Sequence, residues 1–119
     1  MALIRCNGGD ALVTLTQIGT ATISNTSATS VSLSESMSNY QFIFISQAAF
    51  DGDKFDDSDS STGGFVFAKP SEFSSARHLY WRMGSGTGGD TSVTATDATT
   101  LSLTQSAASS RNYYVYGVK

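Results

Sequence analysis

At its C-terminal end the chain has the sequence Asn112-Tyr113-Tyr114-Val115-Tyr116-Gly117-Val118-Lys119. Aromatic and β-branched residues crowd this segment, and such a composition favours a β-strand. Large side chains at consecutive positions point to both faces of a strand, and leaving them in water is costly, so both faces are expected to pack against something. A terminal segment stays ordered when it is tied into a sheet. This ending therefore predicts a compact all-β module.

A second segment, residues 40–47, has the same two-sided character. It reads Tyr-Gln-Phe-Ile-Phe-Ile-Ser-Gln, so Phe42 and Phe44 share one face and Ile43 and Ile45 share the other. A strand that is apolar on both faces is expected at the centre of a sheet, with both faces covered. One cover would be a second sheet. The other could be a further copy of the chain.

The composition supports one all-β domain over residues 1–119. That length accommodates a single domain with a real core. Charged residues make up only 14% of the chain, against about 25% in an ordinary soluble domain. The polar share comes instead from 20 Ser and 14 Thr, which suit strands, turns and wet sheet faces. Long runs of strong helix formers are absent.

Period-two alternation predicts several more strands. Val31 and Leu33 should face inward, as should Leu101 and Leu103 in a hairpin formed by residues 91–96 and 100–104. Residues 78–83 should place Leu79, Trp81 and Met83 on one face, with Trp81 in the core, and His78, Tyr80 and Arg82 on the other. Gly19 is expected to end a strand over 12–18, and residues 84–90 are expected to form a flexible loop. Eight to ten short strands at near-regular spacing predict an antiparallel β-sandwich of jelly-roll type.

Charge and hydropathy limit which classes of partner are expected. The net charge is −3, the pI is near 4.7, and the seven Lys and Arg are scattered, so neither nucleic acid nor a membrane surface is an expected partner. No apolar run reaches 18 residues, so no membrane span is expected. The single Cys6 cannot form an internal disulfide. The N-terminus is too short and too soon polar for a signal peptide, so synthesis and folding in a reducing cytosol are expected.

Enzymatic chemistry has little support, and no catalytic residue or cofactor is expected. His78 is the single histidine, so any Ser-His-Asp or Cys-His device would have to use it, and its mid-strand position fits a surface or interface histidine better. The glycines of 84–89 lack the following Lys of a phosphate-binding loop. Glu35 and Glu72 fit turns or the surface, whereas paired catalytic carboxylates need rigid supports.

An acidic loop raises the question of a metal. Five of the ten acidic residues fall within nine positions, and oxygen-rich loops of this kind can bind Ca²⁺. The spacing does not match an EF-hand, and a solvated loop that keeps the protein soluble is the simpler interpretation. The candidate calcium ligands are Asp51, Asp53, Asp56, Asp57 and Asp59.

Four aromatic residues are candidates for contact with a partner or ligand. Tyr80 and Tyr113 are expected to face away from the core, and Phe50 and Phe55 lie in the long segment 48–64. An exposed Tyr on a β-face can stack on a sugar, and it is also common at subunit interfaces, which is the favoured alternative here. Segments 48–64 and 84–90 are the candidate contact loops.

Several of these segments together resemble a known family. The alternating strand Val31-Ser32-Leu33-Ser34-Glu35-Ser36 leads through the corner Met37-Ser38-Asn39-Tyr40 into a bulky strand, and Tyr-Val-Tyr-Gly-Val-Lys ends the chain. Residues 28–119 thereby resemble β-sandwich modules of bacteriophage and prophage virion proteins, such as tail, fibre and head-fibre components of phages of Gram-positive bacteria. Val118 replaces the Ile usual in that ending, and the acidic loop is an addition. Residues 1–27 lie outside the resemblance and could form an N-terminal extension or an oligomerisation segment.

The resemblance implies a non-enzymatic structural or attachment protein of a virion, often a homotrimer, that contacts other virion proteins and could contact a host surface glycan. Two alternatives remain open. One is a head or tail decoration protein with no ligand. The other is a stand-alone carbohydrate-binding module, which a missing secretion signal disfavours.

Overall fold

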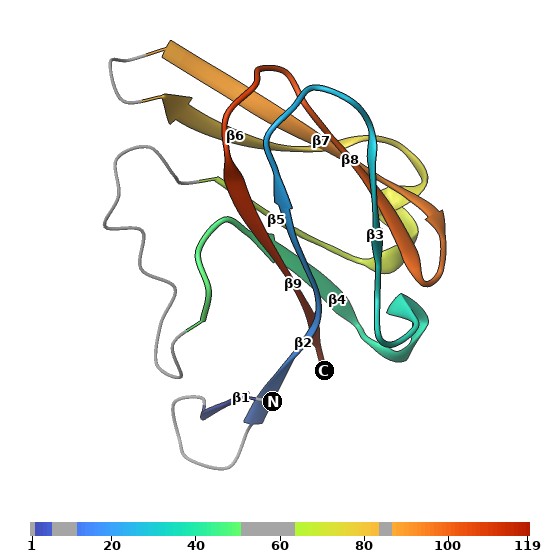
Figure 1. Cartoon of the computed structure of the whole chain (residues 1–119). Coiled ribbons are helices and arrows are strands. Elements are labelled where there is room, and N and C mark those ends of the chain that lie inside the picture. Colours follow the sequence, from blue (N-terminus) through green and yellow to red (C-terminus); the bar gives the residue numbers. More distant parts are fainter. Residues whose placement is uncertain (1, 6–11, 51–63, 84–86) are drawn as a thin grey trace.

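The structure is a computed structural model that describes residues 2–5, 12–50, 64–83 and 87–119. It confirms an all-β antiparallel sandwich made of two packed sheets (Figure 1). Two short 3₁₀ helices, Met37–Asn39 and Pro70–Ser74, lie between strands. No helix in these described ranges is long and apolar enough to cross a lipid bilayer.

One sheet has five strands and the other has four. The five-stranded sheet has the order β1 (Ala2–Arg5), β2 (Leu12–Ile23), β9 (Arg111–Val118), β4 (Phe42–Ser46) and β5 (Phe65–Ala68). The four-stranded sheet has the order β3 (Thr29–Ser32), β8 (Thr100–Gln105), β7 (Thr87–Asp97) and β6 (Arg77–Met83). All neighbouring strands in both sheets run antiparallel.

The two segments that are apolar on both faces form the centre of the five-stranded sheet. β9 lies between β2 and β4, and β4 lies between β9 and β5 (Figure 1). Their inward side chains are fully buried, as Ile43, Ile45 and Val115 show. Phe44 pairs with Tyr116 on the opposite face of the same two strands. The expected central position of both segments is confirmed.

The core fills the space between the sheets and matches the predicted alternation. Val31, Leu33, Leu79, Trp81, Leu101 and Leu103 are all buried, as predicted. The same cluster takes in side chains that no alternation pointed to, among them Met37 and Phe73 from the two 3₁₀ helices. Burying so many apolar side chains between two sheets is the main source of stability in a sandwich of this size.

The sheet topology does not confirm the jelly-roll type. β2 pairs with β9 and β3 pairs with β8, so in each sheet a strand from the first third of the chain lies beside one from the last third. However, β4 and β5 pair within one sheet, and β6, β7 and β8 form a meander within the other. The confirmed statement is therefore an antiparallel sandwich, and its finer type stays a prediction.

Two glycine-containing regions differ from expectation. Gly19 does not end a strand: β2 continues to Ile23, and its pairing with β9 shifts register between Gln17 and Gly19. A Cβ at Gly19 would lie 2.7 Å from Leu33 Cδ2, so this irregularity brings β2 close to the core. Within the predicted loop 84–90, residues 87–90 belong to β7, and residues 84–86 lie outside the described part.

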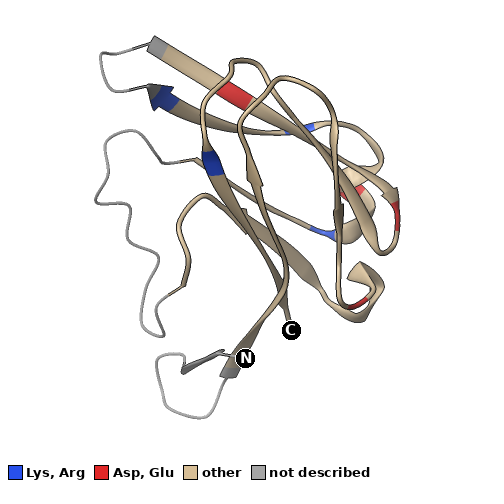
Figure 2. Ribbon diagram, in the orientation of Figure 1, with Lys and Arg blue, Asp and Glu red and all other residues tan. Residues whose placement is uncertain are grey.

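Residues 12–23, which precede the family-like region, form a strand of the sandwich. β2 pairs with β9 along most of its length, and its side chains Ile18 and Ile23 are buried in the core. Charged side chains on the described strands are few and widely separated (Figure 2). Most of the two outer sheet surfaces is therefore uncharged, and the chemistry of each surface depends on aromatic or hydroxyl side chains.

Candidate functional site

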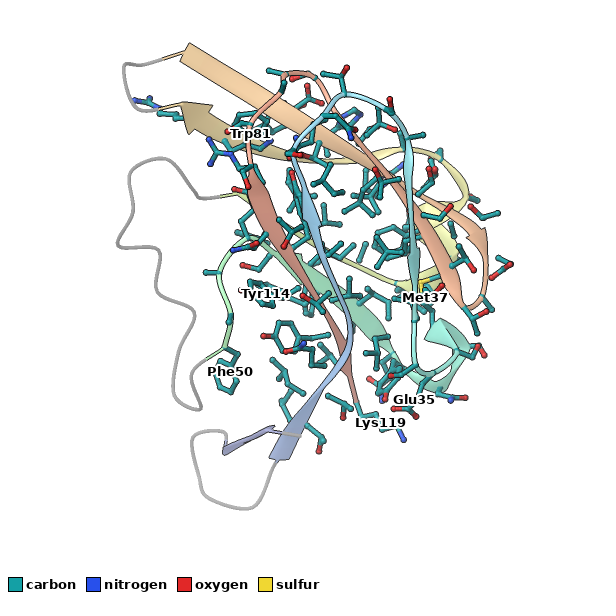
Figure 3. All side chains as sticks on the ribbon, viewed as in Figure 1. Glu35, Met37, Phe50, Trp81, Tyr114 and Lys119 are labelled. Carbon is teal, nitrogen blue, oxygen red and sulfur yellow. The ribbon has the colours of Figure 1, made fainter. Side chains whose placement is uncertain are left out.

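The outer surface of the five-stranded sheet carries a continuous apolar cluster, here called the aromatic face. It follows from the alternation of the central strands, which sends one set of side chains into the core and the other set outward. Figure 3 shows Tyr114 and Phe50 on the side of β9 away from the core residue Met37. The aromatic face consists of Val13, Leu15, Phe42, Phe44, Phe50, Phe65, Phe67, Tyr114, Tyr116 and Val118.

Stacked rings organise this face across β5, β4 and β9. Phe42 and Phe67 stack with centroids 4.8 Å apart, and Phe44 and Phe65 stack at 5.6 Å, both pairs with planes 17° apart. Phe44 also meets Phe67 edge-on at 6.1 Å and Tyr116 at 6.5 Å. Such pairs hold one another in place, so the face is a preformed surface and not a set of independent side chains.

Two phenylalanines of this face remain open to solvent in the single chain, whereas Leu15, Tyr116 and Val118 are buried. Phe65 is 61% exposed and Phe67 is 48% exposed, although both are large and apolar. Beside them, a hollow of about 390 Å³ is lined by Val13, Leu15, Gln41, Phe42, Phe44, Phe67, Val118 and Lys119. Among the described lining residues, only Gln41 and Lys119 have polar side chains. The arrangement can bury apolar surface, and these lining residues include no Ser, Thr, Cys, His, Asp or Glu.

Phe50, one of the predicted contact residues, lies at the border of this face. Its backbone N–H donates to the Tyr116 hydroxyl at 2.8 Å, and its ring packs against the same apolar cluster. Burial raises the pKa of the Tyr116 phenol above its ordinary value. The second predicted loop residue, Phe55, lies outside the described residues.

Tyr113 is not a surface residue, and the expectation that it faces away from the core is wrong. Its side chain is fully buried, and its hydroxyl donates to Gln105 Oε1 at 2.7 Å. Because the Tyr113 hydroxyl donates its one proton to Gln105, the Thr91 hydroxyl is the donor in the 2.5 Å hydrogen bond between Thr91 and Tyr113. Trp81 Nε1 in turn donates to Thr91 at 3.0 Å. Tyr113 thus belongs to a buried hydrogen-bond chain, and burial raises the pKa of its phenol.

Tyr80, in contrast, lies on the outer surface of the four-stranded sheet and is 70% exposed. It pairs with Asp90 on β7, and its ring lies roughly parallel to that of His78, with centroids 6.1 Å apart. His78 Nδ1 is 2.8 Å from Asp90 Oδ2. Tyr80 is thus accessible and Phe50 partly accessible, but they lie against the outer surfaces of different sheets.

The structure does not test the candidate calcium ligands, because all five lie outside the described residues. They are Asp51, Asp53, Asp56, Asp57 and Asp59. Within the described ranges, no three His, Cys, Asp or Glu side chains gather in a way that could hold a metal ion. The calcium site therefore stays a prediction from the sequence.

Sequence reasoning missed a buried arginine beside Trp81. Arg111 is 5% exposed, and its guanidinium carbon lies 4.1 Å from the centroid of the Trp81 ring. Its Nη2 donates to the Arg82 carbonyl at 2.7 Å, while its buried Nη1 has no hydrogen-bond partner in the described structure. No local pattern could reveal this contact, because β9 and β6 belong to different sheets. The arginine fastens the start of β9 to the opposite sheet.

Comparisons with family models, with curated proteins and with solved structures found no match for this chain.

Proposed function

We propose that this protein is a non-enzymatic structural and attachment module of a bacteriophage virion, and that it works as a homotrimer whose subunits meet through the aromatic face. The exposed, stacked phenylalanines of that face carry the proposal. The number three and the virion setting come from the resemblance of residues 28–119 to phage tail and fibre modules. Peripheral attachment to a host glycan, in contact with other virion proteins, is part of the same proposal.

In this proposal, a second copy of the same chain covers the aromatic face. Soluble monomers rarely leave a contiguous apolar surface of this kind uncovered. The exposed rings of Phe65 and Phe67 lie on β5, the edge strand of the five-stranded sheet, so a second copy docked there would cover both.

The chemistry of the aromatic face also favours a protein partner over a sugar. Glycans need hydrogen-bonding groups beside the stacking ring, whereas the hollow on this face is lined by apolar side chains except for Gln41 and Lys119. Interfaces between subunits are rich in aromatic residues and poor in charge at their centre. Both features are present here.

Oligomer mass tests this proposal directly. We expect light scattering to give about three times the 12.5 kDa chain mass for the wild-type protein. The double variant Phe65→Ser, Phe67→Ser should be monomeric and still folded, because both side chains are largely outside the core. Tyr80→Ala, on the other sheet, is the matched control and should stay trimeric. A wild-type monomer at high concentration would overturn the proposal.

Attachment is tested with a cell-wall preparation from a Gram-positive host. Sites that are weak one at a time gain a factor of about 10² to 10⁴ when several bind one surface together. The wild-type oligomer should therefore be retained on the wall, and the monomeric double variant should wash off. Equal retention of the two proteins would contradict an attachment role that depends on assembly.

A further inference from the structure

The outer surface of the four-stranded sheet has a chemistry opposite to that of the aromatic face. Its outward positions on β7 and β8 are occupied by hydroxyl side chains, including Ser92, Thr94, Ser102 and Thr104. One large aromatic ring, that of Tyr80, stands out on this polar surface with 70% exposure. A single exposed ring amid hydroxyl groups does not make a protein interface core, which needs contiguous apolar area.

Neighbouring side chains on β6 and β7 surround the Tyr80 ring in a defined arrangement. His78, two residues earlier on β6, presents a ring tilted by only 20° from that of Tyr80. Asp90 is the direct cross-strand partner of Tyr80, and its carboxylate holds His78 through the 2.8 Å contact to Nδ1. Ser106 fixes the backbone of Asp90 on both sides, since Asp90 N–H donates to Ser106 Oγ at 2.9 Å and Ser106 N–H donates to Asp90 O at 2.8 Å.

Within the described part of the chain, two polar atoms beside the ring have no partner and are available for a ligand. Asp90 uses Oδ2 for His78, which leaves Oδ1, and His78 uses Nδ1, which leaves Nε2. When His78 is uncharged and its Nδ1 proton is donated to the carboxylate, Nε2 is an acceptor. Two acceptors beside an exposed aromatic ring suit a ligand with an apolar C–H face and neighbouring hydroxyl donors. A pyranose ring has both.

The open side of Tyr80 supports a ligand of that size. The next outward residue on β6 is Arg82. The cross-strand partner of Arg82 is Gly88, which has no side chain that could block access to the Tyr80 ring. The Asp90 carboxylate and the Arg82 guanidinium carry opposite charges on either side of Tyr80, so the surface favours neither an anionic nor a cationic sugar. A neutral ring is therefore the best match.

We propose that Tyr80, His78 and Asp90 form a subsite for a neutral pyranose of a surface glycan, with the sugar stacked on Tyr80 and its hydroxyls donating to Asp90 Oδ1 and His78 Nε2. The inference deepens the proposed attachment role and rests on it. It assigns assembly to one outer surface of the sandwich and recognition to the other.

Titrations of the ¹⁵N-labelled full chain by NMR test the subsite, with methyl β-D-glucopyranoside, methyl β-D-galactopyranoside and N-acetylglucosamine as probes. At least one sugar should give saturable shifts in residues 78–82 and 88–92, with a Kd on the order of 1 to 10 mM. Tyr80→Ala should weaken that binding about tenfold or more, and Tyr80→Phe, which keeps the stacking face, should change it by less than about threefold. Asp90→Asn should weaken it by an intermediate factor.

The controls separate this inference from the assembly proposal. Tyr80→Ala must keep the wild-type melting temperature and oligomer mass, because the side chain is largely exposed. Absence of saturable shifts with all three sugars up to about 50 mM would overturn the subsite. Unchanged binding by Tyr80→Ala would do the same. If sugar binding held while the wild-type protein proved monomeric, the subsite would stand, and the protein would be a carbohydrate-binding module instead of a trimeric virion component.

Discussion

Phe42 and Phe67 stack on the outside of the sandwich, although they are diagonal and not direct partners across β4 and β5. The direct partner of Phe67 is Phe44, which it meets edge-on. The stack therefore forms within one chain, before any second copy binds. Preorganised rings lose little side-chain freedom on association, which favours binding through this surface.

Replacing Phe67 with Ala should affect association more than folding. Within one chain the change removes one stacked and one edge-on ring contact, worth about 0.5 to 1.5 kcal/mol each. At the proposed interface it removes a half-exposed ring of the edge strand β5. The wild-type melting temperature should rise with protein concentration, as expected for an oligomer, and that of Phe67→Ala should not. A wild-type melting temperature independent of concentration would count against the interface.

Tyr113→Phe should destabilise the fold by about 1 to 3 kcal/mol. The change deletes the hydroxyl that joins Thr91 to Gln105, and it leaves Gln105 Oε1 buried without its donor. Urea unfolding of the two proteins measures the difference. Tyr114→Phe is the control, because that tyrosine is only half-buried and its hydroxyl makes no hydrogen bond within the described structure; its effect should stay within about 0.5 kcal/mol. Equal losses in both variants would exclude the buried chain as the cause.

Two adjacent glycines should respond very differently to alanine. A Cβ at Gly89 would lie 2.6 Å from Trp81 Cη2, inside the contact distance, whereas a Cβ at Gly88 would meet only the Trp81 carbonyl oxygen at 3.7 Å. Gly89→Ala should therefore displace the indole and cost about 1 to 3 kcal/mol. Gly88→Ala should be near neutral. Since Trp81 is the single tryptophan, its fluorescence in the native state reports the displacement. An unchanged emission spectrum for Gly89→Ala would contradict this packing.

Alkaline pH should destabilise the protein through its buried tyrosines. Burial raises the pKa of Tyr113 and of Tyr116 above the ordinary value of 10.0. Below that value both folded and unfolded chains keep the phenols neutral, so the stabilisation is fully present. As pH rises beyond it, the unfolded chain ionises first and binds fewer protons, so stability falls.

Urea unfolding between about pH 8 and pH 11 checks this expectation. The decline in stability should be shallower in Tyr113→Phe than in the wild-type protein. Tyr80→Phe, with its exposed ring, should leave the slope unchanged. A flat wild-type profile over the whole range would show that the buried phenols do not couple to folding.

Local alternation was enough to predict the interior of most strands. Leu79, Trp81, Leu101 and Leu103 face the core as the period-two pattern requires. The pattern failed at Tyr113, because aromatic side chains occupy both parities at the start of β9 and the periodic signal vanishes there. It also failed at Gly19, where the shift in pairing with β9 belongs to two strands and not to one.

Residue order alone therefore established the all-β class, the central character of the two bulky strands and the inward sets of β6 and β8. Strand pairing between distant segments decided the rest. Nothing in Phe65-Val66-Phe67 says which parity faces inward, and Val66 is buried because it pairs with the inward residue Ile45. That pairing exposes two phenylalanines and creates the aromatic face. Likewise Tyr80, His78 and Asp90 meet only because β6 and β7 align in one register. A surface is a property of neighbouring strands, so it appears only once the sheets are assembled.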